Sequence, residues 1–131
     1  MKEALRSAAE APNVRCDWPR STQVVWMPYN VYVIELDPEV LTCSRFCRAN
    51  PDRREDKPCV YVGSTALSPE ERLRQHLSGV KSNRYAYSYG VALRPRLYRN
   101  LQDYESRKLA EAAEARLAQR LRKRGYAVWY G

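Results

Sequence analysis

Three short apolar segments stand out in the pattern of hydrophobic and polar positions along the chain. Residues 29–36 (YNVYVIEL) alternate as a strand does and are apolar on both faces, which predicts a strand in the middle of a sheet. Residues 59–62 (CVYV) form an apolar run that ends at Gly63, which is typical of a second buried strand. Residues 91–93 (VAL) predict a third strand, which Pro95 shortens or places at a sheet edge.

The first predicted helix follows the second apolar run. Ser68 suits an N-cap, Pro69 suits the first helical position and Glu71 completes a capping box, so the helix should begin at Pro69. Its apolar stripe comprises Leu73, Leu77 and Val80. Arg72 and His76 lie four residues apart on one side of the helix, with His76 on the shoulder of the stripe. Both can face the end of the nearby strand, although surface charges and a half-buried histidine are the plainer interpretation.

The best predicted helix spans residues 104–124, which are rich in Ala, Leu, Glu and Arg and are followed by a glycine. Its apolar stripe comprises Leu109, Ala110, Ala113, Leu117, Ala118 and Leu121. Glu114 falls inside that stripe, whereas Glu111 lies at its edge and Glu105 in the first turn. A carboxylate that faces a core needs a partner, so Arg72 or a metal ion is expected beside Glu114. A solvated glutamate at the margin of the stripe is the alternative.

The segments before and between the two tyrosine-bearing strands are less regular. Residues 1–22 are expected to form an N-terminal arm, helical or frayed at its start, and residues 23–27 suit a short strand or an extended segment. Residues 37–58 form an insertion between the two strands, with a helical turn from Asp37 through Cys47 and a charged loop after it. This insertion is expected either to contact substrate or to pack over an edge of the sheet.

Two later segments bear on binding. Residues 81–90 (KSNRYAYSYG) interleave basic residues with tyrosines, which suits nucleic acid as well as it suits a loop whose rings pack on the sheet. The long helix ends in a basic cluster of Arg116, Arg120, Arg122, Lys123 and Arg124. Because basic residues favour a helix C-terminus through its dipole alone, this cluster is not interpreted as a nucleic-acid patch. Residues 126–129 then predict a short closing strand or an extended packing segment.

The length and charge of the chain narrow its class. Its 131 residues suit a single domain with a core of its own. A formal net charge of +8, from 23 basic and 15 acidic residues, favours a polyanionic partner, nucleic acid first, with a basic but inert surface as the alternative. No apolar run approaches the roughly 20 residues that span a bilayer, and the start of the chain lacks the apolar stretch of a secretory signal. A cytoplasmic protein with no membrane contact and no obligate protein partner is expected.

The chain has four cysteines, at Cys16, Cys43, Cys47 and Cys59. In a reducing compartment they are expected to be free thiols. Cys43 and Cys47 have the spacing of half a zinc site, which keeps open a zinc-stabilised interaction protein as a third function. Cys59 lies within a predicted strand, where cysteine usually acts as a small hydrophobe.

The second apolar run and the helix after it resemble the second half of the GIY-YIG nuclease signature. Residues 61–63 are Tyr-Val-Gly, with Gly63 as a structural position of the motif. The helix carries Arg72 and His76 in the spacing Arg-x-x-x-His. Each match alone is a weak signal, but the order of strand, glycine and helix makes the resemblance specific.

The rest of the signature is found on both sides of that unit. Tyr32 is similar to the first family tyrosine, with Asn30 in place of the glycine, and Glu114 matches the glutamate of a later helix, so the resemblance covers residues 29–129. It implies an α/β (α+β) fold with a small antiparallel three-stranded central sheet flanked by helices. The insertion at residues 37–58 is longer than the family hairpin, and the asparagine that many members carry after the glutamate helix is missing. A nucleic-acid-binding module that keeps the fold without cleaving is therefore the main alternative to a nuclease.

The resemblance implies a metal-dependent endonuclease that hydrolyses phosphodiester bonds, of DNA more than of RNA. Glu114 would hold Mg²⁺ or Mn²⁺, and Arg72 would donate hydrogen bonds to the phosphate. Tyr32 would act as the base, with its pKa lowered by Arg72, His76 and the metal. Tyr61 would position water or phosphate, and His76 would shuttle the proton. Further nucleic-acid contacts are expected from Arg74, Lys81, Arg84 and Arg94.

Overall fold

The chain folds around a four-stranded sheet in a computed structural model that describes residues 28–79 and 82–131. The strands are β2 (Asn30–Leu36), β3 (Cys59–Thr65), β4 (Gly90–Leu93) and β5 (Ala127–Tyr130), in the order β4-β2-β3-β5. The predictions for residues 1–27, which include Cys16, and for Val80 and Lys81 lie outside the described residues.

The sheet is mixed in strand direction. β2 pairs antiparallel with β3 and with β4, whereas β5 runs parallel to β3. The predicted α/β class, with a small sheet flanked by helices, is confirmed, and the three expected strands pair antiparallel as predicted. The predicted closing strand adds a fourth, β5, which is parallel to its neighbour. This strand is parallel to β3 because α4 (Arg107–Lys123) carries the chain back along the sheet before β5 begins.

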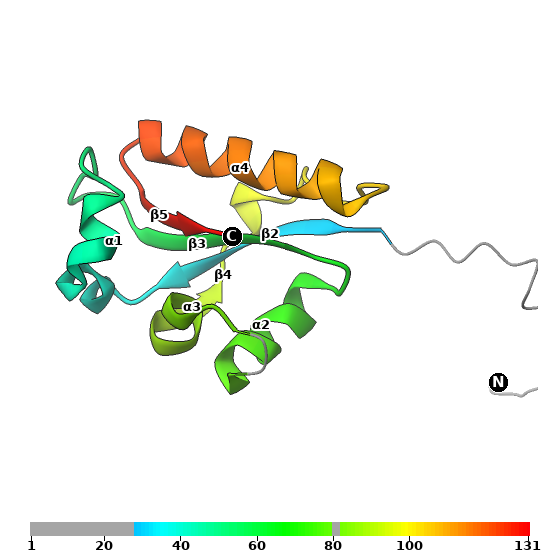
Figure 1. The fold of residues 1–131 in the computed structure, drawn as a ribbon, viewed down its shortest axis with the longest axis horizontal. Coiled ribbons are helices and arrows are strands. Elements are labelled where there is room, and N and C mark those ends of the chain that lie inside the picture. The colour runs from blue at the N-terminus through cyan, green and yellow to red at the C-terminus, as the bar shows by residue number, and fades with distance from the viewer. Residues whose placement is uncertain (1–27, 80–81) are drawn as a thin grey trace, which may run out of the picture.

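Helices cover both faces of the sheet (Figure 1). α4 lies on one face, against β3 and β5, while α2 (Pro69–Ser78) and α3 (Arg84–Tyr89) lie on the other, against β2 and β4. With both faces covered, β2 is buried along most of its length, which confirms its prediction as a central strand. Among the described residues, none of the helices has the length and apolar character needed to cross a bilayer.

The two predicted helices begin differently from each other. α2 begins at Pro69 as predicted, with Ser68 and Glu71 forming the capping box. α4 begins three residues later than predicted, after Ser106, whose hydroxyl caps it. The backbone of Tyr104 exchanges two hydrogen bonds of 2.9 Å with that of Tyr29, which holds this part of the chain extended. Glu105 therefore precedes the helix and is not in its first turn.

The apolar stripes of both helices were predicted with errors at their ends. In α2, Leu77 is 45% exposed and His76 is the buried residue, because the helix packs on the sheet through its histidine. In α4, Leu109 is 51% exposed and lies in the first turn. The rest of that stripe is buried as predicted: Ala110, Ala113, Leu117, Ala118 and Leu121, together with Glu114.

The basic, tyrosine-rich segment at residues 81–90 was expected either to contact nucleic acid or to form a loop whose rings pack on the sheet. Neither interpretation included a helix, whereas the structure has α3 at Arg84–Tyr89. The side chain of Asn83 accepts a hydrogen bond from the Tyr85 N–H at 2.8 Å and starts the short helix α3. This helix buries Tyr85 and Ala86 against the core, where the Tyr85 ring lies 5.4 Å from that of Phe46. Packing of this aromatic pair favours the helix more than its sequence does.

The insertion at residues 37–58 packs over the β5 edge of the sheet. It contains a 3₁₀ helix (Pro38–Thr42), capped by Asp37, and α1 (Ser44–Arg48), so the predicted helical turn is confirmed but divided at Cys43. After α1, the buried Asn50 accepts a hydrogen bond from the Val128 N–H at 2.8 Å and donates one to the Val128 carbonyl at 3.0 Å. One side-chain amide thus pairs with the exposed edge as a neighbouring strand would.

Strand β3 continues past Gly63, where the apolar run was predicted to end, because Gly63 is paired with Tyr32 across the β2–β3 ladder. Directly paired residues project from the same face, and the Tyr32 ring lies over the glycine. A methyl group at Gly63 would stand 2.6 Å from Cζ of Tyr32 and closer still to its hydroxyl group. The missing side chain at Gly63 therefore makes the space that the Tyr32 ring fills.

We expect Gly63→Ala to lower the free energy of unfolding by about 1–3 kcal/mol, because the methyl group overpacks a buried ring. The smaller gain from a less flexible unfolded chain, about 0.4–1 kcal/mol, only partly offsets this loss. Urea denaturation measures the net change in the free energy of unfolding. The control is Ala92→Ser, which also adds one heavy atom but at an exposed position of β4. Equal stabilities of Gly63→Ala and wild type would mean that Tyr32 moves away without cost.

Candidate active site

Strand β5 ends before its neighbour β3 does, and the candidate residues meet in the space beyond its end. β5 pairs with β3 only as far as Val62, so the last residues of β3, including Gly63 and Ser64, have no neighbouring strand on that side. Tyr32 and Tyr61 project from the face covered by α2, and Ser64 from the face covered by α4. Beyond the end of β5, side chains from both faces can therefore reach one cavity.

That cavity, called the site cavity here, has a volume of about 530 Å³. It is lined by Tyr32, Tyr61, Gly63, Ser64, Arg72, Ser82, Asn83, Glu111, Glu114, Tyr130 and Gly131. Four of the five predicted catalytic residues are in this lining, and the fifth, His76, is fully buried directly behind Tyr32. A second cavity of about 420 Å³ is contiguous with it, because Ser64, Arg72 and Glu111 line both.

A chain of three hydrogen bonds leads from Tyr32 through the buried His76 to Ser82 and Asn83. The Tyr32 hydroxyl lies 2.8 Å from Nε2 of His76, and Nδ1 of His76 lies 3.0 Å from Oγ of Ser82. The Ser82 hydroxyl donates its own proton to the Asn83 carbonyl at 3.1 Å. Ser82 can then only accept from His76, so Nδ1 carries the proton and Nε2 accepts the proton of Tyr32.

The electrostatics of this chain keep all of its members neutral. Burial, with a smaller contribution from the positive charge of Arg72, lowers the pKa of His76 to about 4. Burial raises the pKa of Tyr32 to about 12, although Arg72 acts in the opposite direction. Lowering of the tyrosine pKa was predicted from nearby positive charge, and this is wrong for the protein alone because desolvation is the larger effect.

Tyr61 is held in a different way from Tyr32. Its hydroxyl donates a hydrogen bond to the carbonyl of Gly131 at 2.9 Å, and its ring meets the His76 ring edge-on at 5.3 Å. Burial raises its pKa well above the usual range, and the negative charges that would develop on Tyr32 and Glu114 add to this. Tyr61 is therefore a protonated hydrogen-bond donor at neutral pH.

Glu114 is the buried carboxylate of the site, only 6% exposed. Burial raises its pKa, and the negative charge of Glu111 adds to this, while hydrogen bonds from the Ser64 side chain and the Gly131 N–H lower it. The sequence predicted Arg72 or a metal as its partner, and it missed Ser64, which lies one position after the glycine of the motif. Ser82 was missed for the same reason, since neither serine has a distinctive pattern around it.

Asn30, which stands where the signature has glycine, connects two loops that flank the site. Its side-chain amide donates to the Leu67 carbonyl at 3.3 Å and accepts from the Asp103 N–H at 2.9 Å. Leu67 precedes α2, which carries Arg72, and Asp103 precedes α4, which carries Glu114. A glycine has no side chain with which to make either bond.

The donors present in the site cavity fit a hard divalent cation. Mg²⁺ binds through one or two carboxylates, completes its shell with waters and substrate phosphates, and needs no all-protein cage. Glu114 and Glu111 supply carboxylates in a cavity with room for several waters. Among residues 28–79 and 82–131, no group of three or more His, Cys, Asp or Glu side chains could enclose a metal ion alone.

The described cysteines, Cys43, Cys47 and Cys59, are free. Cys43 lies 3.5 Å from the Tyr89 hydroxyl, and Cys47 donates to the Leu41 carbonyl at 3.1 Å. Cys59 is buried in β3, in the role predicted for it.

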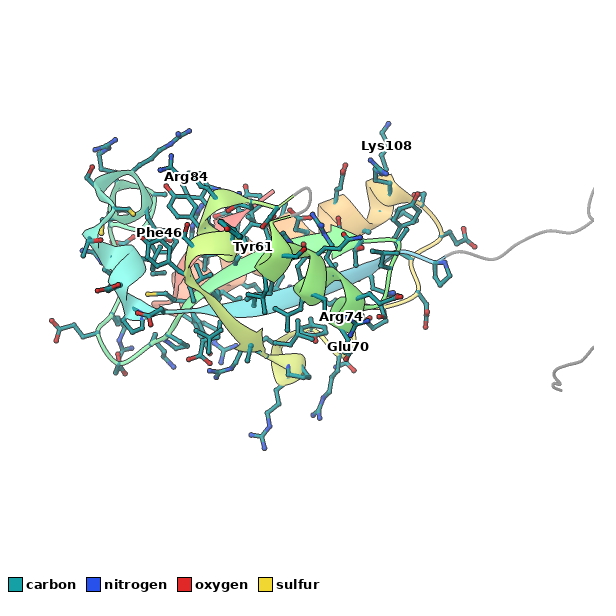
Figure 2. All side chains as sticks on the ribbon, turned by 90° about the horizontal axis from the view of Figure 1, so that it is seen from below. Phe46, Tyr61, Glu70, Arg74, Arg84 and Lys108 are labelled. Atoms are coloured by element: carbon teal, nitrogen blue, oxygen red, sulfur yellow. The ribbon has the colours of Figure 1, made fainter. Side chains whose placement is uncertain are left out.

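The predicted nucleic-acid contacts that the structure describes do not line the site cavity. Arg94 pairs with Glu35 at 3.1 Å on the β4 side of the sheet, and Arg84 stacks over the Tyr85 ring at 5.6 Å. Figure 2 shows Arg74 and Arg84 on opposite sides of Tyr61. None of these three arginines is among the described residues that line the site cavity, and Lys81 lies outside the described residues.

Comparison with known proteins adds one finding. The family model described as the GIY-YIG catalytic domain matches residues 29–127, most of the chain. The curated proteins and the solved structures give no significant match.

The lowered pKa of His76 makes folding sensitive to acid. Between about pH 6.5 and pH 4 the unfolded chain takes up a proton on His76 that the folded chain does not. The free energy of unfolding should therefore fall as the pH falls through that range, by up to about 3 kcal/mol. Glu114, whose pKa is raised, contributes in the opposite direction.

Urea denaturation of wild type and His76→Gln between pH 4 and pH 7 isolates this contribution, because His76 is the only histidine of the chain. His76→Gln is expected to lose less stability on acidification, whatever its stability at pH 7. Parallel curves for the two proteins would contradict the neutral, buried state of His76.

Proposed function

The chain belongs to the GIY-YIG catalytic domain family, and on that premise we propose that it is a divalent-cation-dependent endonuclease that hydrolyses the phosphodiester bonds of nucleic acid, DNA more than RNA. The observation that supports this most directly is the convergence of one set of side chains on the site cavity: Tyr32, Tyr61, Arg72 and Glu114, with His76 behind Tyr32. These are the residues that match the family signature, and they come from β2, β3, α2 and α4.

Hydrolysis of a phosphodiester needs an activated water, stabilisation of negative charge at phosphorus, and help for the leaving oxygen. Glu114 is the residue that would hold Mg²⁺ or Mn²⁺, with Glu111 beside it in the lining. When bound, the cation would supply positive charge that favours the transition state and the departing oxygen.

Arg72 binds the phosphate itself in this proposal. Its side chain lines the site cavity and also the contiguous cavity beside it, and it donates to Gln75 Oε1 at 2.8 Å. A planar guanidinium can donate two parallel hydrogen bonds to phosphate oxygens, which orients the ester as well as neutralising it.

Tyr32 and His76 form a proton relay in this proposal. With a pKa of about 12, Tyr32 has almost no phenolate at neutral pH, so it is not a base on its own. Its proton points to Nε2 of His76, which is neutral and has a free lone pair. Tyr32 can then accept a proton from water as it passes its own to Nε2, while Nδ1 keeps its bond to Ser82.

Tyr61 is given a positioning role in this proposal. Its hydroxyl donates to the Gly131 carbonyl and remains protonated, so its oxygen can accept a hydrogen bond from water and orient it, but it cannot remove a proton. It can bind a phosphate oxygen only by giving up its bond to Gly131. This agrees with the division of labour in which the first tyrosine of the signature is the base.

A nucleic-acid-binding module that does not cleave is the alternative function. The observation in its favour is the absence of asparagine from residues 115–131, where many family members carry one. The net charge of +8 supports binding in both cases.

Replacement of Glu114 by glutamine separates the two functions. Wild type is expected to cleave with Mg²⁺ or Mn²⁺ and to stop in EDTA. Glu114→Gln should cleave roughly two to four orders of magnitude more slowly, because the shape remains but the ligand charge is lost. Its binding should be unchanged or tighter, since one negative charge near the phosphate has gone. Rates on plasmid, single-stranded DNA and RNA provide the measurement.

Arg72→Ala is the comparison variant for this experiment. It should also stop cleavage, but unlike Glu114→Gln it should weaken binding, because its contact is with the phosphate. If Glu114→Gln cleaves as fast as wild type, the metal site proposed here is wrong. If wild type binds nucleic acid but cleaves it with neither Mg²⁺ nor Mn²⁺, the protein is better described as a binding module.

Binding should weaken steeply with salt for an enzyme and for a binding module alike. A handful of phosphate contacts releases enough counterions to lower affinity by roughly two to three orders of magnitude between about 50 and 200 mM salt. Fluorescence anisotropy with labelled duplex and single strands in EDTA measures this slope. An affinity that does not respond to salt would count against nucleic acid as the partner.

A further inference from the structure

A third cavity, of about 520 Å³, lies at the C-terminal end of α4. It is lined by Ala49, Asn50, Pro51, Asp52, Arg53, Gln119, Arg122, Lys123 and Tyr126, and is called the basic cavity here. Three cations and one carboxylate face it, and they come from two separate parts of the chain. Figure 1 shows this end of α4 beside α1 and the loop that follows α1.

Tyr130 connects the basic cavity to the site cavity. Its side chain belongs to the lining of the site cavity. The guanidinium of Arg122 lies 5.4 Å from the centre of its ring, and Nε2 of Gln119 donates to its hydroxyl at 3.4 Å. Both Arg122 and Gln119 line the basic cavity, so Tyr130 contacts two residues of that cavity while it lines the site cavity.

Arg122 is fixed in place before any ligand arrives. Its Nε donates to Oδ1 of Asn50 at 3.0 Å and its terminal nitrogen to the Val128 carbonyl at 2.9 Å. A guanidinium that is already ordered loses less conformational entropy when it binds an anion. The buried Asn50 thus both covers the sheet edge and orients a cation of the cavity.

One face of α4 runs past both cavities. Arg107, Glu111, Glu114 and Arg122 follow one another at spacings of four, three and eight residues, which keeps them on one side of the helix. The carboxylates of the site lie in the middle and an arginine lies toward each end. From Glu114 to Arg122 the helix rises about 12 Å, the distance covered by about three to four phosphates along one strand of a duplex.

The helix dipole does not account for this arrangement. It favours cations at the last turn of α4 but gives no reason for Arg53, in the loop after α1, to face the same cavity. Asp52 reduces the positive charge there and leaves an excess of two.

We propose that the basic cavity binds the phosphodiester backbone of the nucleic-acid substrate about four nucleotides from the cleaved bond. The inference rests on the proposed function and gives the insertion a part in substrate binding. The chemistry recognised is the phosphate, which duplex DNA, single-stranded DNA and RNA share.

The test is equilibrium binding of labelled duplex DNA in EDTA, measured by anisotropy from 50 to 300 mM salt. The double variant Arg53→Ala/Lys123→Ala should bind roughly tenfold more weakly at intermediate salt, with the salt slope reduced by about two. The matched control is Arg96→Ala/Arg99→Ala, which removes the same charge from exposed positions after β4, at the opposite edge of the sheet. Its slope should remain that of wild type.

Two further measurements sharpen the result. Lys123→Gln alone, in which the side chain stays long, should lower the slope by about one and serves if the double variant fails to fold. On duplexes trimmed to fewer than about four base pairs beyond the cleavage position on either side, wild type and Lys123→Gln should bind alike. Single-stranded DNA and RNA, tested in parallel, show which source of phosphate is preferred.

Equal losses in the test pair and the control pair would overturn the inference, since net charge alone would then explain binding. So would a Lys123→Gln slope equal to that of wild type. Either result leaves the proposed nuclease intact as long as wild type binds. A wild type that binds no nucleic acid would instead overturn the proposed function, and the inference with it.

Discussion

The buried hydrogen bond between the Tyr32 hydroxyl and His76 is the interaction on which the arrangement of the site depends. It joins the central strand β2 to α2, which otherwise presents few apolar residues to the sheet. It exists only because Gly63 leaves space for the tyrosine ring, and it is satisfied only because Ser82 holds the other nitrogen of the imidazole. A polar pair without water must be fully bonded, so each member constrains the next.

That constraint also explains the charge distribution of the site. Burial removes charge from Tyr32, Tyr61 and His76, which leaves Glu114 and Glu111 as the carboxylates and Arg72 as a guanidinium in the lining of the site cavity. A carboxylate this buried is stabilised by the Ser64 hydroxyl and the Gly131 N–H, which are dipoles and not charges. Its negative charge is therefore not neutralised by them and remains available to a cation, which is what a metal-dependent hydrolase would require.

Much of the fold could be predicted from local pattern, and the site only in part. The capping box at Ser68, the central character of β2 and the place of Glu114 in a buried stripe all follow from spacing along one element. The sequence did not indicate that His76 would be the residue through which α2 packs, because that depends on the space over Gly63 in another element. Helix α3 was missed because its stability comes from the packing of Tyr85 on Phe46, about forty residues earlier.

Strand β5 links the insertion to the chemistry. At its middle, Val128 is held from outside by Asn50, and its continuation, Gly131, accepts from Tyr61 and donates toward Glu114. A strand of four residues with a parallel neighbour on one side only is weakly specified by itself. Without the Asn50 amide, the open edge of β5 would keep the bond from Arg122 to the Val128 carbonyl but lose the partner of the Val128 N–H. A shift of β5 would displace the partners of Tyr61 and Glu114 together. The insertion therefore serves the site through the backbone position of β5, separately from the part in substrate binding proposed for Arg53.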